Sequence, residues 1–492
     1  MARGQRAGVV LVTVAVGFAV AAGAAGHTED ERLGVLVGRY HELELFDGAA
    51  LVARDGVILL DRGYGLASRE FGVPNGGDVR YRLASISKTF TAALVHQLVD
   101  EGRLTLDTPL VEILPEYRSD TGARVTIRHL LGHTSGIPDY FRVAGGWAAF
   151  AARMDTTRPS KPEFVASLCS GDLEFEPGSR WSYSNCGYFL LGMVIERVTG
   201  APFEQVLRSR VLDPAGMTDS GDEGADPEAV IERLASCYVR TPEGIRRQGY
   251  WNMATAFAAG SLYATPRDLL RYDRALTGDT LLSTGAKEAM YTAGPGGYGL
   301  GWEIRDRAVG PDGAVRRIAT HEGFLFGSHT RIYRVLEDGV LVVLLSNAGD
   351  APLEDMATGL LDLLYGREPA LPRSPVSNEI ARVLHDGGID AAVARYREIS
   401  AKEPQRWDLG ERQLNVLGYS LLREGRVEEA LTILELNVET YPESGNCHDS
   451  LGEALAAAGR TTEAVRAYAR SLQLDPTNRN AVERLRHLVG AS

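Results

Sequence analysis

Lysine is rare in this sequence. Of the 52 lysines and arginines in the chain of 492 residues, four are lysine. A genome-wide bias is one explanation, because arginine, alanine and glycine are abundant throughout. Lys88 nevertheless lies three residues after Ser85, and this spacing places two side chains on one face of a helix. A lysine ammonium can give up its proton in a suitable environment, whereas an arginine guanidinium does not. Lys88 is therefore a candidate for proton transfer.

Cysteine is also scarce, and the spacing of the four residues fits no zinc site: Cys169, Cys186, Cys237 and Cys447. In an oxidising compartment a pair such as Cys169 and Cys186 can form a disulfide, and buried free thiols are the alternative. His321 and Glu322 do not begin a His-Glu-x-x-His helix, and no glycine-rich phosphate loop is apparent. The sequence therefore predicts neither a metal nor a cofactor.

Positive charge is in deficit, and long apolar runs are absent after the first segment. The formal net charge of −13 argues against non-specific binding to nucleic acids and to anionic membranes. Residues 1–26 combine Arg3 and Arg6 with an apolar run and small residues, which is typical of a cleaved export signal. An uncleaved anchor is the alternative, although the run is slightly short for a span. We expect an exported protein, periplasmic or secreted, without a membrane span after cleavage.

Residues 30–367 mix strand and helix signals, which predicts an α/β domain. Residues 49–62 form two β-rich runs separated by Asp55-Gly56, a strong hairpin signal, and residues 330–345 repeat this pattern. Two hairpins at opposite ends of a domain suggest one antiparallel sheet that both ends complete. Helices are expected between them, for example over 89–100 and 188–198, each followed by a glycine.

Residues 368–378 are predicted to be a proline-rich linker to an all-α region at 379–492. In this region four small or helix-ending residues recur after 34 positions: Gly418, Gly425, Ala430 and Pro442 return as Gly452, Gly459, Ala464 and Pro476. The period resembles that of tetratricopeptide repeats. A degenerate unit is expected at 379–405, and a generic helical hairpin is the alternative. Such repeats suggest a protein partner, or an appendage that only packs or dimerises.

Two further short segments carry polar groups suited to catalysis. Tyr183-Ser184-Asn185 lies between a Pro-Gly turn and a helix. The phenol of Tyr183 can act as a general base if nearby cations lower its pKa, and the amide of Asn185 can hold Lys88 and a substrate carbonyl. His321-Glu322-Gly323 is the third segment, just before the last hairpin.

Ser-x-x-Lys alone is a short pattern that occurs by chance. Here, however, it begins an ordered set of motifs: LLGHTSGIPDY at 130–140, FEPGSRWSYSN at 175–185, AAGSLYATPRDL at 258–269, YGLGW at 298–302 and HEGF at 321–324. In this order they resemble the serine β-lactamase-related family, which contains class C β-lactamases, D-alanyl-D-alanine carboxypeptidases, D-aminopeptidases and related esterases. The resemblance implies an antiparallel sheet flanked by helices, with a helical domain inserted and the site between the two.

The resemblance also implies a role for each residue. Ser85 would be the acylated nucleophile, Lys88 its activating partner, and Tyr183 the base that also protonates the leaving group. Asn185 would be a supporting polar group. On the strand that carries the third motif, Gly323 would let the substrate approach closely. The backbone N–H groups of Phe324 and Ser85 would then form the oxyanion hole.

One position departs from the family pattern. His321 replaces a lysine that helps β-lactam-cleaving relatives to attract the substrate carboxylate, and a histidine with an ordinary pKa is mostly uncharged at neutral pH. We therefore expect a serine hydrolase that acts on esters, amides or D-amino-acid peptides, with penicillin hydrolysis in doubt. The alternative is a catalytically silent penicillin-binding-like fold that binds partners through its repeats. The intact Ser85, Lys88 and Tyr183 argue against this alternative.

Overall fold

The computed structural model describes residues 28–156, 159–226, 228–241, 244–249, 251–325, 327–349 and 351–490. The predicted export signal, residues 1–26, lies outside these ranges. Within them, no helix is both long enough and apolar enough to cross a membrane.

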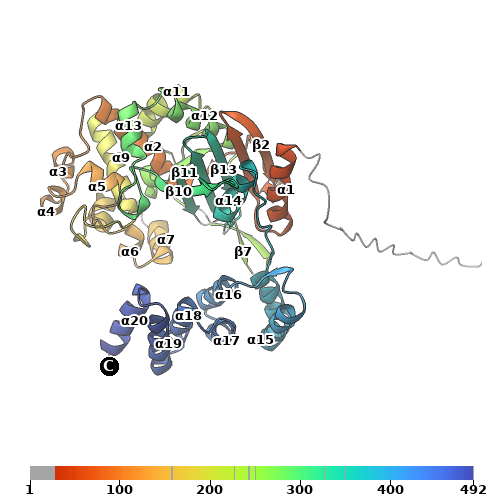
Figure 1. Cartoon of the computed structure of the whole chain (residues 1–492). Helices are drawn as coiled ribbons and strands as arrows, with labels where there is room; N and C mark the ends of the chain where they lie inside the picture. The colour runs from red at the N-terminus through yellow and green to blue at the C-terminus, as the bar shows by residue number, and fades with distance from the viewer. Residues whose placement is uncertain are drawn as a thin grey trace, which may run out of the picture.

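A six-stranded antiparallel sheet forms the centre of the N-terminal part (Figure 1). Its spatial order is β10 (Glu303–Val309), β11 (Ala314–Leu325), β12 (Ser328–Val335), β13 (Val340–Ser346), β1 (Gly48–Arg54) and β2 (Val57–Tyr64). The first strand lies beside the last, with Gly48 opposite Ser346 and Arg54 opposite Val340. The prediction that both ends of the domain complete one sheet is therefore confirmed.

The turn of the first hairpin explains why its sequence signal is strong. Asp55 and Gly56 both have left-handed backbone angles, with φ of 48° and 75°. A two-residue turn with this handedness matches the twist of the strands that it joins, and Asp-Gly adopts it readily. The local sequence thus sets the register of β1 and β2.

Helices cover both faces of the sheet. Helices α1 (Glu29–Glu42) and α14 (Leu353–Leu364) pack on one face and form an apolar core with β1, β12 and β13. Helices α2 (Ser87–Asp100), α9 (Asn185–Thr199) and α12 (Pro266–Thr277) belong to the larger core on the other face. Every residue of β13 is buried, as expected for a central strand covered on both sides.

The segment between β2 and β10 builds the helical region beside the sheet. Its helices are α3 (Leu110–Ile113), α4 (Ser119–Gly122), α5 (Ile127–Leu131), α6 (Tyr140–Val143), α7 (Trp147–Thr156), α8 (Lys161–Phe164), α10 (Phe203–Leu207), α11 (Asp213–Ala215) and α13 (Thr284–Met290). Short strands accompany them: β3 (Leu66–Ser68), β4 (Val73–Pro74), β5 (Tyr81–Arg82), β6 (Gly221–Asp222), β7 (Tyr238–Thr241), β8 (Gly244–Arg247) and β9 (Leu262–Ala264). An antiparallel sheet flanked by helices, with a helical region inserted between its strands, is the arrangement that the resemblance implies.

Helix α2 runs through the middle of this N-terminal part. All ten residues from Ser87 to His96 are buried, on every side of the helix. A helix buried all round shows no apolar stripe, so its sequence is only weakly amphipathic. Side chains that project from α2 are consequently surrounded by protein, and this holds for Lys88.

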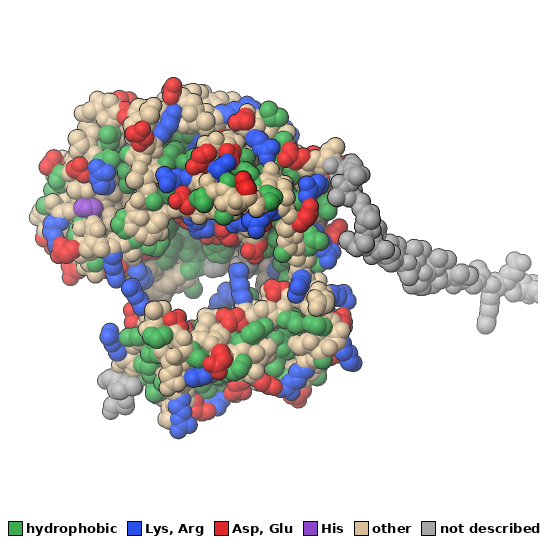
Figure 2. Space-filling view, viewed as in Figure 1, with side chains coloured by type: hydrophobic (Ala, Val, Ile, Leu, Met, Phe, Trp, Pro, Cys, Tyr) green, Lys and Arg blue, Asp and Glu red, His purple; other side chains and the backbone are tan. Residues whose placement is uncertain are grey.

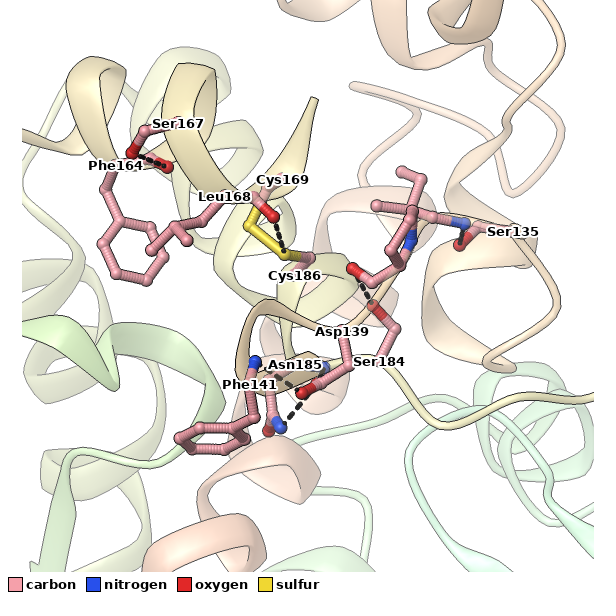
Figure 3. Close-up of a disulfide and its surroundings, with 12 residues drawn as sticks. Ser135, Asp139, Phe141, Phe164, Ser167, Leu168, Cys169, Ser184, Asn185 and Cys186 are labelled. Atoms are coloured by element: carbon pink, nitrogen blue, oxygen red, sulfur yellow. Dashed lines mark hydrogen bonds between the residues drawn. A yellow bond between two sulfur atoms is a disulfide. The ribbon is translucent and has the colours of Figure 1, made fainter. Parts of the chain in front are cut away.

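A disulfide connects two parts of the helical region. Cys169 ends the π-helical turn Val165–Cys169, and Cys186 lies in the first turn of α9, with 5.4 Å between their Cα atoms (Figure 3). The sequence left open whether these two cysteines are paired. Cys237 and Cys447 are free thiols.

The C-terminal part is entirely helical apart from one pair of two-residue strands. It contains α15 (Val376–Lys402), α16 (Glu411–Arg423), α17 (Val427–Thr440), α18 (Gly445–Ala457), α19 (Thr461–Leu474) and α20 (Arg479–Gly490). Helix α15 begins inside the segment 368–378, and Gly388, with φ of 80° and ψ of −179°, breaks it into two. Strand β14 (Ser374–Pro375) pairs with β15 (Trp407–Asp408) beside α15.

Two helix crossings in this part are equivalent and lie 34 residues apart. A Cβ atom on Gly418 would lie 2.6 Å from the side chain of Leu434, and one on Gly452 would lie 2.8 Å from that of Tyr468. Glycine is therefore needed at both positions because the paired helices approach closely. Two apolar cores hold these helices together, and both consist only of residues from Val376 onward.

Candidate active site

Ser85 lies at a strained turn that leads into α2. The 3-10 turn Ala84–Ile86 precedes the helix, and Ala84 has a left-handed backbone with φ of 49°. This conformation costs a residue with a side chain roughly 1–2 kcal/mol. Two hydrogen bonds of Leu83 hold the turn in place. Its N–H donates to the carbonyl of Leu262, and the Leu83 carbonyl accepts from Thr330 Oγ1 at 2.8 Å. The Ser85 side chain is thereby presented to a cleft.

Lys88 lies one helical turn further on, with no exposed surface. Its Nζ contacts three acceptors: Ser85 Oγ at 2.9 Å, Asn185 Oδ1 at 2.8 Å and the carbonyl oxygen of Ala259 at 2.7 Å. Burial lowers the pKa of Lys88 to about 7, against the opposing effect of the Asp139 carboxylate. Near neutral pH a substantial fraction of Lys88 is therefore an uncharged amine that can accept a proton.

Tyr183 contacts the same serine from the other side. Its hydroxyl donates to Ser85 Oγ at 2.8 Å. Burial raises the pKa of this phenol far above its ordinary value, and the hydrogen bond with Ser85 offsets this only in part. The prediction that nearby cations lower the pKa of Tyr183 is wrong, because loss of water around the ring dominates and the nearby charge of Asp139 raises the pKa further. In the resting site Tyr183 is a proton donor.

His133 holds the loop that carries Tyr183. The N–H of Ser182 donates to the carbonyl of His133 at 2.9 Å, and that of Ser184 donates to its ring Nδ1 at 3.2 Å. The imidazole also packs 4.3 Å from the phenol ring of Tyr183, between centroids. The ring Nδ1 of His129 likewise accepts from the N–H of Thr126, the N-cap residue of α5.

His321 is held in one neutral state on β11. Its Nδ1 lies 2.7 Å from the carbonyl oxygen of Glu322, an acceptor, so Nδ1 carries the hydrogen. Its Nε2 then accepts from the hydroxyl of Tyr298 at 2.9 Å. Burial and the charge of Lys88 lower the pKa of His321 to about 3. This site therefore has no cation at position 321.

Gly323 has a close neighbour within the protein itself. The sequence assigned its small size to substrate approach. In the structure a Cβ atom at this position would lie 2.1 Å from the carbonyl oxygen of Leu83 and 3.2 Å from the Cβ of Ala84. The close neighbour is thus the turn before Ser85, which β11 supports directly. Phe324 follows, with 48% of its surface exposed, and lines the cleft.

The cleft itself has a volume of about 990 Å³ and lies between the sheet edge and the helical region. Ser85, Tyr183, Asn185, His321 and Phe324 line it, with Lys88 bonded to two of them from the interior. Aromatic side chains form much of its wall: Tyr140, Phe141, Trp147, Trp181 and Tyr298. Within the described part of the chain, no group of three or more His, Cys, Asp or Glu side chains is placed to hold a metal.

Three further residues hold this site together. Tyr298 bonds His321, His133 holds Tyr183, and Asp139 accepts two hydrogen bonds from Asn185. All three lie in the motifs YGLGW and LLGHTSGIPDY, so the motifs indicated these positions in the chain as candidates. Their functions depend on contacts that only the fold creates.

Comparison with known proteins identifies the family of this chain. The sequence model of one family, described as Beta-lactamase, matches residues 41–365. The chain belongs to the β-lactamase family. Esterase EstB of Burkholderia gladioli is 31% identical over 369 residues, which cover 66% of this chain and 92% of that protein. Penicillin-binding protein 4* of Bacillus subtilis is 29% identical over 360 residues, which cover 69% of this chain and 76% of that protein.

The solved structures similar to this chain include the D-amino acid amidase of Ochrobactrum anthropi. Its TM-score is 0.56 at 25% identity, and the match covers 68% of this chain and 96% of the amidase. This chain is a serine hydrolase of the same family as these proteins. The family match ends at residue 365, so helices α15 to α20 lie outside it.

Proposed function

We propose that this β-lactamase-family protein cleaves an ester or amide bond through a covalent acyl-enzyme on Ser85. One observation carries the proposal. The Ser85 oxygen lies within hydrogen-bond distance of a base and of an acid at once, Lys88 Nζ at 2.9 Å and Tyr183 Oη at 2.8 Å. Burial makes the amine easier to deprotonate and the phenol harder, so the two groups have opposite tasks.

The acylation step follows from these states. Neutral Lys88 accepts the hydroxyl proton of Ser85 as Oγ attacks the carbonyl carbon, and negative charge develops on the carbonyl oxygen. The backbone N–H groups of Ser85 and Phe324 are the proposed donors to that oxygen. Tyr183 gives its proton to the leaving nitrogen or oxygen as the bond to the acyl carbon breaks. Lys88 is then an ammonium and Tyr183 a phenolate.

Deacylation uses the same groups in reverse. Water occupies the position of the departed group, gives a proton to the Tyr183 phenolate and attacks the acyl carbon. The ester bond to Ser85 breaks, and Oγ takes the proton of the Lys88 ammonium. The products are a carboxylic acid and the starting enzyme, with Lys88 neutral and Tyr183 protonated.

The neutral His321 and the aromatic cleft favour substrates that need no cation at position 321. A carboxylate in the substrate would find no cation at position 321, because both ring nitrogens are bonded and the pKa is about 3. We infer that small esters, amides or D-amino-acid peptides are cleaved faster than carboxylate-bearing β-lactams. The names of two similar proteins, an esterase and a D-amino acid amidase, support this substrate class.

Covalent labelling tests the nucleophile. A fluorophosphonate should add its mass to the peptide that contains Ser85, and Ser85→Ala should abolish the adduct. Ser182→Ala is the matched control, because Ser182 lies in the loop beside Tyr183 and should remain without effect on labelling. An adduct that survives in Ser85→Ala would disprove the assignment.

A ratio of activities tests the substrate class. Nitrocefin carries a carboxylate, and p-nitrophenyl acetate does not. The wild type should prefer the ester, and His321→Lys should raise the nitrocefin-to-ester ratio of kcat/KM. A wild type that hydrolyses nitrocefin faster than its best ester would contradict the role given to His321.

The C-terminal helices and the export signal belong to the same proposal. We propose that residues 379–492 are tetratricopeptide-type repeats that bind a protein partner or the distant part of a large substrate. The equivalent close crossings at Gly418 and Gly452 support repeats of 34 residues. Helices α16, α18 and α20 lie on the side of this part that faces the hydrolase domain (Figure 1). The disulfide supports export, since such bonds persist in oxidising compartments.

A further inference from the structure

The side-chain amide of Asn185 has a defined orientation, and Asp139 sets it. Asp139 Oδ2 accepts from the backbone N–H of Asn185 at 2.7 Å and from its Nδ2 at 2.8 Å (Figure 3). An ionised carboxylate can only accept hydrogen bonds. The NH₂ group of the amide must therefore face Asp139, and the amide oxygen must face the other way, toward Lys88.

The reversed amide would be unfavourable on both sides. Its oxygen would oppose the carboxylate of Asp139, and its NH₂ group would oppose the amino group of Lys88. Without Asp139, only the contact with Lys88 would select between the two orientations. The carboxylate thus determines that Asn185 offers Lys88 an acceptor.

That acceptor decides where the free electron pair of Lys88 points. A neutral amine has two N–H groups and one lone pair. Asn185 Oδ1 and the carbonyl oxygen of Ala259, at 2.8 and 2.7 Å, are both acceptors and take the two hydrogens. The remaining direction leads to Ser85 Oγ at 2.9 Å. A lone pair aimed at the serine hydroxyl is what a general base requires.

We propose that Asp139 is a positioning residue: it fixes the amide of Asn185, which directs the lone pair of Lys88 to the hydroxyl of Ser85. The proposal rests on the proposed function, because it assumes that Lys88 is the base for Ser85. Asp139 is 9% exposed, and its other oxygen accepts from the N–H of Phe141 at 2.9 Å at the start of α6. The segment 130–140 is thereby connected to the catalytic group.

The charge of Asp139 also has a distinct effect. Four titratable side chains from other elements surround Lys88, and all four are uncharged at neutral pH: Tyr183, Tyr188, His133 and His321. The carboxylate of Asp139 is the charge that favours the protonated amine and opposes the effect of burial. Removing it should lower the pKa of Lys88 further. A purely structural role for Asp139 would not have this consequence.

The test compares Asp139→Asn and Asp139→Ala with the wild type, using full-length protein and a p-nitrophenyl ester. Rates are normalised to the fraction of Ser85 that a fluorophosphonate labels, so unfolded protein does not count. In the wild type kcat/KM should rise with pH as Lys88 loses its proton, and this rise is called the acid limb. Both variants should move the acid limb to lower pH by about one pH unit or more, because an opposite charge near the amine is lost. Asp139→Ala should also lower the plateau by roughly 10²-fold, since the amide is no longer held.

Asp268→Asn is the matched control. Asp268 is fully buried and lies outside the cleft. Like Asp139, it accepts two hydrogen bonds, one from the backbone N–H of Asp219 at 2.8 Å and one from the hydroxyl of Ser220 at 2.7 Å. It should lower the melting temperature without moving the acid limb. If Asp139→Ala keeps the wild-type plateau, or if both Asp139 variants keep the wild-type acid limb, the inference is wrong while the proposed function stands. If the wild type itself has no acid limb or Ser85 is not labelled, the proposed function fails and the inference fails with it.

Discussion

Burial and charge oppose each other at Lys88, and the balance between them sets the chemistry. A fully buried ammonium is costly, yet three acceptors surround this one and Asp139 lies nearby. The result is an amine with a pKa of about 7 rather than one that is permanently charged or permanently neutral. A base is most effective when its pKa lies near the working pH, because it can then both accept and return a proton.

This balance predicts the response to pH and to Lys88→Arg. The base is active when neutral, so kcat/KM should rise as the pH increases through about 7, the pKa to which burial lowers Lys88. Lys88→Arg keeps a cation but cannot lose its proton, so ester hydrolysis should fall roughly 10³-fold or more. Lys402→Arg, at a side chain 71% exposed, is the control and should have no effect. Near-normal turnover with arginine at 88 would mean that the site needs only a positive charge.

Gly323 gives a second prediction at this scale. Gly323→Ala should lower the melting temperature and the ester activity together, because the new Cβ meets the Leu83 carbonyl and forces β11 away from the turn before Ser85. Overpacking of this kind typically costs about 1–3 kcal/mol. Gly285→Ala is the control, since a Cβ there would have its nearest neighbour at 3.9 Å. An unchanged melting temperature and activity in Gly323→Ala would mean that the strand and the turn tolerate separation.

Sequence reasoning at the residue scale identified which groups meet but not their states. Ser85, Lys88, Tyr183 and Asn185 come together as predicted, because each belongs to a motif with a recognisable order. The pKa of Tyr183 was predicted in the wrong direction, since it depends on how completely distant segments exclude water from the ring. The neighbour of Gly323 was also missed, because Leu83 is distant from it in the sequence and meets it only through tertiary packing.

At the scale of elements, local signals were the reliable ones. Asp55-Gly56 predicts the first hairpin because the turn needs two left-handed residues. Gly102 and Gly200 follow two predicted helices, and in the structure these helices end at Asp100 and Thr199. The start of α15 at Val376, inside the segment predicted as linker, was missed because the proline-rich composition there hides it. The pairing of Cys169 with Cys186 depends on where two separate helices pack, which spacing alone does not determine.

Removal of the disulfide gives the testable prediction at the scale of elements. The disulfide connects Cys186, in the first turn of α9 and next to Asn185, to Cys169 at the end of the π-helical turn. Replacing Cys169 and Cys186 by serine should destabilise the hydrolase part by roughly 3 kcal/mol, the loop-closure value for a loop of this length. It should also slow labelling of Ser85, because Asn185 is held less firmly. Thermal melting and the rate of fluorophosphonate labelling measure the two effects.

A reductant provides the control. Dithiothreitol should lower the melting temperature of the wild type toward that of the double serine variant, and it should leave the variant unchanged. If the wild type is insensitive to complete reduction, verified by thiol counting, the disulfide does not contribute to stability.

At the scale of the whole molecule, the chain consists of two parts with separate cores. The apolar clusters of the hydrolase part end at Tyr365, and those of the C-terminal helices begin at Val376. The segment between them contributes one ion pair to the hydrolase part, Arg32 with Glu368, whose carboxylate is 83% exposed. In the space-filling view a hollow separates the two parts (Figure 2). Neither part therefore depends on the other for its apolar core.

A truncation after Gly366 should consequently remain folded and active. Every candidate catalytic residue lies upstream, and the lost ion pair is exposed, so it contributes at most about 1 kcal/mol. We expect kcat/KM for a small ester to stay within about twofold of full length and the melting transition of the hydrolase part to persist. If the C-terminal helices act as proposed, recognition of a partner or of a large substrate should be lost with them.

The competing possibility is that the helices α16, α18 and α20, which face the hydrolase part, act on the cleft directly (Figure 1). In that case truncation would change the KM of even the smallest ester, or expose apolar surface and cause aggregation. The two possibilities separate when one small ester and one long D-amino-acid peptide are assayed with both proteins. A loss confined to the long peptide would assign the repeats to the distant part of the substrate, since the chemistry at Ser85 would be intact. An equal loss on both substrates would instead make the repeats part of the active site and would contradict the independence of the two parts.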